Sequence, residues 1–470
     1  MSYEKVFNEI KKVGVIGAGP AGLVAARELK KEGFEVVVYE QNADVGGIWL
    51  YNPNVGNDPV GLELTEPNQG TIYQSLRTNI TREAMGYMDY PLLVKEGRNH
   101  RRFPAHHEIL LYLKDFARDF NLVELIRFNT KVEYVGMVGE DKECVSTGED
   151  GRNMDGDPMD ERVPWVVRAR NAGIVEEEVF DAVVVCNGHF RKPKIAEIPG
   201  AQKWPGKQIH SLNYRVPKLF ANQVVVIIGS SASAYDILSD LKTVAKEVHM
   251  SIRSTHMKHE KDASIHIDLH HPNVHLHPLV TYLDEDGIVV FGDGSTIIAD
   301  SIIHCTGYSY SIPFLDTNGM VIVENTGVSP LYEHIFPPLL APSLSFVGIP
   351  NKIISFPFFE LQSKWIASIL SRKVKLPSRR DMIKTVEESY DYHQEKIGLY
   401  KHLMHDIGNF EYCDQLADRS GEARFEEWRK EIVTETVKLL LSNPVTFRDM
   451  WDENYMLELL DKTPTVIIDS

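Results

Sequence analysis

The sequence predicts an α/β protein with two doubly wound, Rossmann-like dinucleotide-binding domains and a C-terminal segment that returns to the first of them. Two glycine-containing turns, each directly after a short apolar run, begin at residues 17 and 229. A D-x-(V/I)-(V/I)-x-C-x-G pattern follows each turn later in the chain, at residues 181–188 and 300–307. Because both copies have the apolar character of buried strands, we interpret them as the closing strands of two similar nucleotide-binding units.

The first turn follows a strand predicted over residues 13–16 and places Gly17, Gly19 and Gly22 in G-x-G-x-x-G spacing. In this motif the first glycine permits a tight turn, the second lets the backbone approach a pyrophosphate, and the third lets the helix pack closely on the strand. The phosphates would meet the N-terminus of the next helix, where unpaired N–H groups favour negative charge. The alternative is a purely structural glycine-rich turn.

An acidic residue follows the second predicted strand, residues 35–39. Glu40 lies 23 residues after Gly17, where a carboxylate accepts hydrogen bonds from a ribose 2′-hydroxyl and repels a 2′-phosphate. The site should therefore hold FAD or NAD rather than NADP. Gly47 and Trp49, just beyond, favour FAD.

The second turn follows an apolar run at residues 224–228 and has Gly229, Ser231 and Ala234 at the three motif positions, so only the first is glycine. The small side chains still allow close backbone approach. Arg253 lies 24 residues after Gly229, where the first unit has its acid. Since an arginine can pair bidentately with a 2′-phosphate, this unit should prefer NADPH over NADH. The alternative is a solvated arginine at a strand end.

The nucleotide-binding pattern stops near residue 330. The remainder is rich in proline and aromatic residues at first, then shows helical patterns and few strands. We expect it to return to the first domain and cover the flavin. The predicted division is an FAD-binding domain in residues 1–214 and 331–470, with an NADPH-binding domain in residues 215–330.

Composition excludes several classes of function. The formal net charge of −17 argues against nucleic acid or an anionic membrane as the main partner. No apolar run approaches about 18 residues, and the N-terminus lacks a signal-peptide core, so neither a membrane span nor secretion is expected. The four cysteines are far apart and form no C-x-x-C pair, which indicates a reduced, cytoplasmic protein.

The chain also carries a histidine-rich stretch. Its members are His256, His259, His266, His270, His271, His275 and His277. Their spacing is irregular and no H-E-x-x-H motif occurs, so we expect surface histidines and no metal site.

The linker between the two turns resembles a family signature. Residues 204–214, WPGKQIHSLNY, are similar to the F-x-G-x-x-x-H-x-x-x-(Y/F) signature of flavin-containing monooxygenases, with Trp204 replacing the usual Phe. The segments RTNITREAMGYMDYP and HCTGY also match the family. FPPLLAPSLSFVGIP together with HCTGY looks most like its plant S-oxygenating branch. One departure is Ala234, where the family usually has glycine. The linker itself suggests a connector, so we assign His210 no acid or base role.

The resemblance implies a reaction. NADPH would reduce FAD, dioxygen would add at flavin carbon 4a, and bound NADP⁺ would shield the hydroperoxide from water. A soft nucleophile would then take one oxygen, and the expected nucleophile is a thioether, which becomes a sulfoxide. The alternative within the family is N-hydroxylation of a small amine or amino acid derivative.

The resemblance also implies two site residues. Asn79 matches the family asparagine that lies over the flavin, where its amide would donate to the hydroperoxide or to NADP⁺. The alternative is an Asx-turn residue before a helix that starts near Thr81. Gln362 is expected to contact the flavin ring.

Other classes stay open at this point. A flavoprotein disulfide reductase would need a cysteine pair beside the flavin, and residues 46–79 contain no cysteine. A non-catalytic protein with structural FAD is a further alternative. The expected partners are a small thioether or amine and dioxygen, and the sequence leaves a homodimer open.

Overall fold

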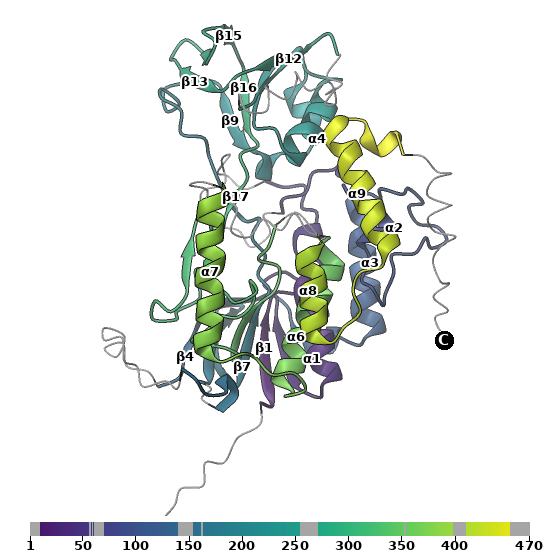
Figure 1. Ribbon diagram of the computed structural model, residues 1–470. Coiled ribbons are helices and arrows are strands. Elements are labelled where there is room, and N and C mark those ends of the chain that lie inside the picture. The colour runs from purple at the N-terminus through teal and green to yellow at the C-terminus, as the bar shows by residue number, and fades with distance from the viewer. Residues whose placement is uncertain are drawn as a thin grey trace, which may run out of the picture.

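The structure is a computed structural model that describes residues 10–55, 58, 60, 70–139, 154–160, 163–253, 271–351, 354–397 and 410–451. Figure 1 shows two lobes, a lower one around β1, β7 and α1 and an upper one around β9, β16 and α4. Each lobe is built on a five-stranded parallel sheet. The predicted α/β class with two dinucleotide-binding units is confirmed, whereas the boundaries at residues 214 and 330 stay predictions.

The lower sheet has the strand order β20-β7-β1-β2-β3. Its strands are β20 (Leu344–Phe346), β7 (Ala182–Val185), β1 (Lys12–Ile16), β2 (Glu35–Tyr39) and β3 (Ile126–Arg127). β1 is central, and the chain leaves it to one side for β2 and returns on the other side as β7. In open parallel sheets ligands bind at such a reversal, beyond the carboxyl ends of the strands. The glycine turn after β1 therefore opens at the expected ligand position.

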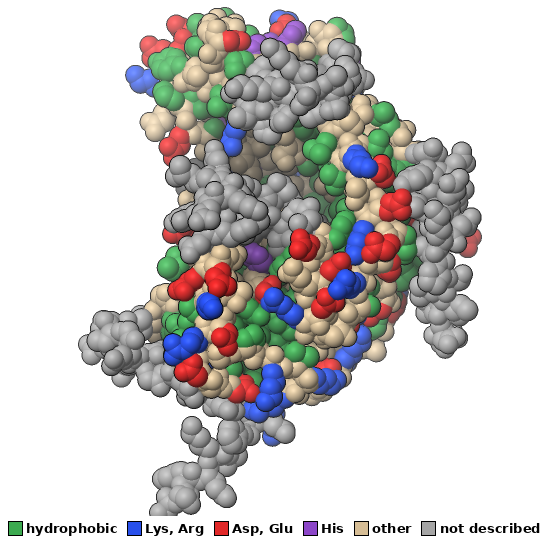
Figure 2. Space-filling view, in the orientation of Figure 1, with side chains coloured by type: hydrophobic (Ala, Val, Ile, Leu, Met, Phe, Trp, Pro, Cys, Tyr) green, Lys and Arg blue, Asp and Glu red, His purple; other side chains and the backbone are tan. Residues whose placement is uncertain are grey.

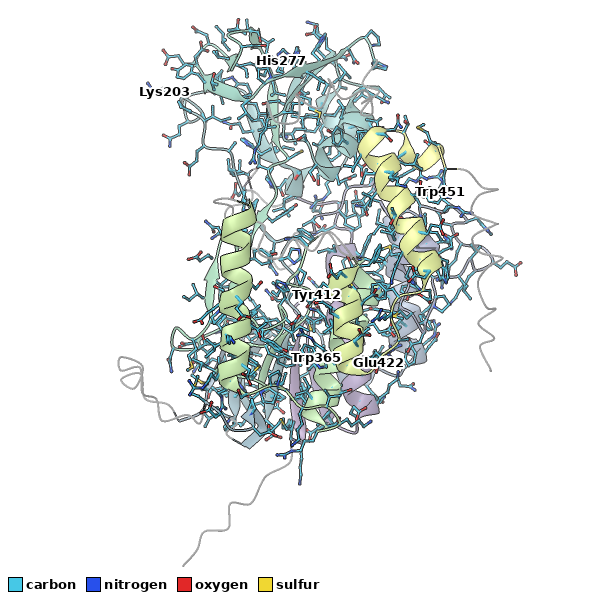
Figure 3. The ribbon with its side chains drawn as sticks, in the orientation of Figure 1. Lys203, His277, Trp365, Tyr412, Glu422 and Trp451 are labelled. Atoms are coloured by element: carbon cyan, nitrogen blue, oxygen red, sulfur yellow. The ribbon has the colours of Figure 1, made fainter. Side chains whose placement is uncertain are left out.

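The C-terminal segment completes the lower lobe. It supplies β20 at the sheet edge and also α6, which packs against α1. One hydrophobic core joins these helices to one face of the sheet, and Trp365 of α6 and Tyr412 of α8 lie within this part of the lobe (Figure 3). The predicted return of the C-terminal segment is thus confirmed. The helices here are α1 (Pro20–Lys31), α2 (Arg82–Met85), α3 (His106–Asp119), α6 (Ser355–Leu370), α7 (Arg379–Ile397), α8 (Glu411–Ser420) and α9 (Glu427–Ser442).

The other face of the lower sheet packs on an antiparallel sheet with order β4-β5-β6. Its strands are β4 (Thr130–Met137), β5 (Trp165–Asn171) and β6 (Ile174–Phe180). Trp165 is fully buried here, and its indole N–H donates to the Ser343 hydroxyl at 3.1 Å. Short pairs of strands complete the fold, namely β8 (Lys192–Pro193) with β17 (Tyr308–Ser309) and β18 (Ile322–Glu324) with β19 (Gly327–Ser329).

The upper sheet has the order β12-β11-β10-β16-β9. Its strands are β12 (Val274–His277), β11 (Glu247–Ser251), β10 (Val224–Ile228), β16 (Ser301–His304) and β9 (Lys207–His210). α4 (Ala232–Leu241) covers one face, and an antiparallel sheet of β13 (Val280–Leu283), β14 (Ile288–Phe291) and β15 (Thr296–Ile298) covers the other. β16 pairs with β10 as β7 pairs with β1, so the repeated sequence pattern occupies equivalent strands.

The surface of the lower lobe has mixed charge on the face drawn in Figure 2, with acidic and basic side chains interspersed. None of the helices in the described part of the chain is long and apolar enough to cross a membrane.

The linker histidine makes structural contacts only. His210 is fully buried; its Nδ1 accepts the Leu212 N–H at 3.0 Å, so its Nε2–H donates to the Gly307 carbonyl at 3.1 Å. These bonds join the linker to the turn after β16, which agrees with the connector role expected from the sequence.

This arrangement predicts a pH dependence of stability. Burial lowers the pKa of His210 to about 4, and likewise that of the neighbouring His304, against an ordinary value of 6.5. As the pH falls, these histidines are protonated in the unfolded state at a higher pH than in the folded state. Their contribution to the free energy of unfolding is therefore complete above pH 6.5 and is lost as the pH falls from 6.5 through about 4. We expect the melting temperature to fall over this window by the equivalent of a few kcal/mol.

His304→Gln, which keeps an N–H donor for Gln208, should flatten the profile between pH 7 and 5. His100→Ala, at an exposed position, serves as the control and should keep the parent slope. Equal slopes for all three proteins would contradict the assignment.

Candidate active site

The glycine turn after β1 is fixed by backbone contacts. Gly17 has φ +107°, and its N–H donates to the Tyr39 carbonyl at 2.8 Å. A Cβ on Gly17 would lie 2.7 Å from the Cys186 carbonyl oxygen, and a Cβ on Gly22 would lie 1.8 Å from the Gly17 carbonyl oxygen. No side chain fits at either position. These two glycines therefore set the turn and the close packing of α1.

Gly19 and Gly47 lie opposite each other, so that their backbones are in close approach. A Cβ on Gly19 would lie 3.5 Å from the Gly47 Cα, and a Cβ on Gly47 would lie 3.0 Å from the Gly19 Cα. Gly19 is also the N-cap of α1, and no side chain caps that helix end. The result is a side-chain-free cradle at a helix N-terminus, which fits the pyrophosphate of a dinucleotide.

Glu40 lies at the end of β2 and is only 4% exposed. Its Oε2 accepts the Ala18 N–H at 2.8 Å and its Oε1 accepts the Asn42 N–H at 2.8 Å. Burial raises the pKa of this carboxyl, and the two backbone bonds oppose the rise. Since each carboxylate oxygen can accept more than one hydrogen bond, Glu40 retains capacity for a ribose hydroxyl.

Sequence reasoning missed Arg191, a cation near Glu40. Burial lowers the pKa of this guanidinium, and the charge of Glu40 acts in the opposite direction. Its side chain makes no hydrogen bond to any residue that the structure describes. Arg191 belongs to no motif, so only its position in space suggests that it could face the phosphates of a bound dinucleotide.

Trp49 packs against α6, and Gln362 belongs to that helix. Trp49, in a short 3₁₀ helix (Gly47–Trp49), packs edge-on against Phe356 at 6.4 Å between ring centroids. Gln362 is fully buried, and its Oε1 accepts the Gly348 N–H at 2.9 Å. Through this bond Gln362 positions the Gly348 turn, and its direct contact with the flavin ring stays a prediction.

The second turn repeats the first. Gly229 has φ +124°, and a Cβ there would lie 2.4 Å from the Cys305 carbonyl oxygen, as Gly17 faces Cys186. Ser231 is the N-cap of α4 and its side chain makes no cap bond, so that helix N-terminus is open. Ala234 is fully buried in the hydrophobic core of the upper lobe. The alanine that departs from the family pattern is thus accommodated by apolar packing.

Arg253 follows the C-terminal end of β11 and is exposed. No described residue accepts a hydrogen bond from its side chain. An exposed guanidinium with no internal partner is available to an anionic group such as a 2′-phosphate. The same exposure fits the alternative of a solvated arginine, so the role of Arg253 in nucleotide choice stays a prediction.

Asn79 lies in the loop before α2 and is exposed. Thr81, the N-cap of α2, makes no side-chain cap bond, and the Asn79 side chain bonds to no described residue. The structure therefore shows no Asx-turn bond at Asn79. Its amide is free to meet a ligand.

The loop that carries Asn79 is fastened to the upper lobe by Arg448, which no sequence motif indicated. Arg448 Nε donates to the Thr78 carbonyl at 2.8 Å, while its Nη1 and Nη2 bind the Asp236 carboxylate of α4 at 2.8 and 3.1 Å. Tyr73 also donates to Asp236 at 2.8 Å. A C-terminal residue thus links the Asn79 loop to the helix of the second nucleotide unit.

The three cysteines that the structure describes form no redox pair beside the first turn. Cys186, Cys305 and Cys413 are free and buried, and burial raises the pKa of each thiol. Cys144 lies outside the described residues. The disulfide-reductase alternative therefore gains no support from this part of the chain.

Two dinucleotide units, one with an acid and one with an arginine at the predicted ribose position, form the architecture expected of a pyridine-nucleotide-dependent flavoprotein oxidoreductase. Comparisons with known proteins identify the family. The family description "Flavin-binding monooxygenase-like" matches residues 10–261 and 263–424. The chain therefore belongs to the flavin-binding monooxygenases, and its cofactors are FAD and NADPH.

Individual relatives agree with this assignment. The flavin-containing monooxygenase FMO GS-OX-like 9 of Arabidopsis thaliana is 48% identical over 456 residues, which cover 95% of this chain and 94% of the relative. The structure of S-allyl-L-cysteine S-oxygenase from Allium sativum is similar with a TM-score of 0.85 and 43% identity, covering 96% of this chain and 98% of that chain. Cyclohexanone monooxygenase from Rhodococcus sp. Phi1, bound to NADP⁺, shares the fold with a TM-score of 0.56 and 15% identity, covering 83% and 90%.

Proposed function

We propose that this monooxygenase transfers one oxygen atom from dioxygen to the sulfur of a small thioether. NADPH and a proton supply the two electrons and the hydrogen, so the products are a sulfoxide, NADP⁺ and water. The observation that carries the proposal is the similarity, over nearly the whole of both chains, to an oxygenase that acts on the sulfur of S-allyl-L-cysteine. A cytoplasmic location and a homodimer stay predictions.

The residues divide the work as follows in this proposal. Gly19 and Gly47 admit the FAD pyrophosphate, Glu40 binds the ribose, and Arg253 binds the 2′-phosphate of NADPH. Bound FAD supplies the activation of dioxygen, including the hydroperoxide chemistry expected from the family resemblance. Asn79 donates a hydrogen bond at the reacting centre from the loop held by Arg448.

The other candidate is N-hydroxylation of a small amine. The deciding experiment is a matched panel of thioethers and amines of similar size, assayed for NADPH consumption and oxygenated product together. We expect sulfoxide formation coupled to NADPH consumption. Hydroxylamine products with no sulfoxide would replace this proposal with the alternative, and NADPH-dependent flavin reduction with no oxygenated product would contradict both.

Arg253→Ala should weaken NADPH binding and leave NADH nearly unchanged. A charge-assisted contact contributes roughly 1.5 to 3 kcal/mol, which corresponds to a change in affinity of about 10-fold to 150-fold. Because Arg253 is exposed, the difference should shrink at high salt. The measurement is the KM for each nucleotide at low and high ionic strength.

The matched control is Lys203→Ala, which removes another exposed basic side chain from the upper lobe (Figure 3) and should change neither KM. An equal loss for NADPH and NADH in Arg253→Ala would mean that Arg253 supports the fold and does not read the 2′-phosphate.

A further inference from the structure

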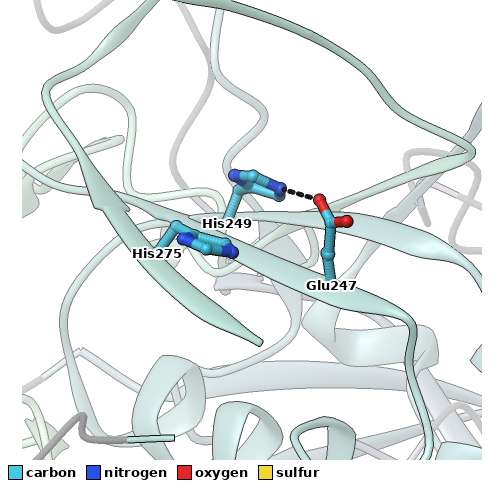
Figure 4. A group of neighbouring side chains, drawn as sticks. All are labelled: Glu247, His249 and His275. Carbon is cyan, nitrogen blue, oxygen red and sulfur yellow. Dashed lines mark hydrogen bonds and ion pairs between the residues drawn. The ribbon is translucent and has the colours of Figure 1, made fainter. Parts of the chain in front are cut away.

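The upper lobe contains a cluster of metal-ligating side chains outside the candidate active site. Glu247 and His249 lie on β11, and His275 lies opposite His249 in the parallel register of β12 (Figure 4). One ligand atom from each residue lies within 4.8 Å of the other two. The two imidazole rings are stacked, with centroids 4.8 Å apart and an interplanar angle of 25°.

One arrangement of the hydrogen-bond chain leaves a nitrogen of His249 open to a metal ion. In this arrangement the Ser295 hydroxyl donates to Asp293 at 2.6 Å and accepts from His277 Nδ1, 3.4 Å away. His277 Nε2 is then the acceptor for His249 Nδ1–H, at 2.9 Å. This polarity leaves His249 Nε2 with a free lone pair.

That lone pair faces a second acceptor. In this arrangement His249 Nε2 and Glu247 Oε2, 3.3 Å apart, are both acceptors, and a cation between them would satisfy both. A proton could fill the gap, and so could a metal ion. His275 adds a third ligand atom, which a proton between the other two would not use.

We propose that Glu247, His249 and His275 bind a divalent transition-metal ion of the Zn²⁺ class. Two imidazole nitrogens and one carboxylate oxygen form a typical three-ligand zinc set, with water completing a tetrahedron. His277 acts as the partner that orients a metal-bound histidine through its other ring nitrogen. Zn–N and Zn–O bonds of about 2.0 to 2.2 Å require the ligand atoms to draw closer together, and His275 is on the edge strand, where it can move.

The bound ion would fasten β12, the edge strand of the upper sheet, to β11. His249 is only 4% exposed and belongs to the packed sheet, whereas β12 pairs on one side only. Binding to the folded chain raises its stability. The irregular spacing of the histidine-rich stretch argued against a metal site. The site proposed here combines His275 of that stretch with two residues of β11, the preceding strand.

The test uses the full FAD-loaded chain after removal of metals with a chelator, titrated with Zn²⁺ by calorimetry and followed by thermal unfolding. We expect one Zn²⁺ per chain and a rise in melting temperature, with Mg²⁺ giving neither. Co²⁺ should give the absorption of a nitrogen- and oxygen-ligated site. His277→Phe, which retains an aromatic ring to stack on Phe291, should weaken Zn²⁺ binding by about 10-fold to 100-fold.

His275→Ala and Glu247→Gln should each weaken Zn²⁺ binding more than His277→Phe does. His100→Ala, an exposed histidine of the lower lobe, is the control and should bind like the parent. Bound FAD and circular dichroism confirm that each variant is folded. Parent-like Zn²⁺ binding in both ligand variants would overturn the proposal and assign the ion to other histidines, and absence of Zn²⁺ binding in the parent would overturn it outright.

Discussion

Gly22→Ala should destroy the FAD site by disrupting the fold around it. The added Cβ would lie 1.8 Å from the Gly17 carbonyl oxygen, which is backbone of the turn itself and cannot rotate away. Overpacking of a core costs about 1 to 3 kcal/mol even where side chains can adjust, so we expect a loss of about 3 kcal/mol or more here. The protein should be recovered without FAD and with a lower melting temperature, or in inclusion bodies.

Gly19→Ala tests the proposed pyrophosphate cradle without disturbing the fold. Gly19 has φ −76°, which any residue adopts, and its new Cβ would make ordinary contact with the Gly47 Cα at 3.5 Å and the Gly47 N at 3.8 Å. The variant should therefore fold with nearly the parent melting temperature of the apoprotein. Its methyl group would stand where the pyrophosphate approaches, and loss of one charge-assisted bond of about 1.5 kcal/mol corresponds to a roughly 10-fold weaker FAD affinity.

Both variants, Gly22→Ala and Gly19→Ala, are characterised by flavin absorbance per chain, by FAD titration of the apoprotein and by thermal unfolding. Recovery of Gly22→Ala with a full complement of FAD and the parent stability would show that the turn can relax. Gly19→Ala with unchanged FAD affinity would show that the cofactor does not pass between Gly19 and Gly47.

Asn79→Ala should uncouple NADPH oxidation from oxygen transfer. The amide is exposed and bonds to no described residue, so its removal costs the fold little and removes the donor that we propose for the reacting centre. One such bond contributes roughly 1 to 3 kcal/mol, or about a 5-fold to 150-fold effect on oxygen transfer. NADPH should still be consumed, with the deficit in sulfoxide appearing as hydrogen peroxide.

Asn79→Asp should be more severe, because a carboxylate cannot donate and repels developing negative charge. The measurement is sulfoxide formed per NADPH oxidised, together with peroxide and melting temperature. Parent coupling with only a lower melting temperature would return Asn79 to a structural role in the loop.

Arg448→Lys tests whether the contacts that hold the Asn79 loop affect coupling without changing Asn79 itself. It keeps a positive charge but loses the fork that binds the Thr78 carbonyl and the Asp236 carboxylate together. If the Asn79 loop is positioned through Arg448, coupling should fall in this variant too, while FAD content stays at the parent level.

The sequence alone determined the architecture, the two cofactors and the family. It could do so because the relevant signals are local: Gly17, Gly19 and Gly22 lie within one turn, and the carboxylate or guanidinium predicted to read the ribose follows each turn at a set distance along one helix and strand. The repeated closing strands are similarly short, and their apolar character identifies them without knowledge of their partners. Such features need only the periodicity of a strand or a helix to be recognised.

Only the tertiary structure decided the contacts that join distant segments. Arg448 meets Thr78 across 370 positions of the chain, and Gln362 of α6 binds the backbone of Gly348. His249 meets His275 because parallel pairing of β11 and β12 places them opposite each other. The register of a parallel pair and the docking of a C-terminal helix are set by packing over the whole fold, and local spacing contains no record of either.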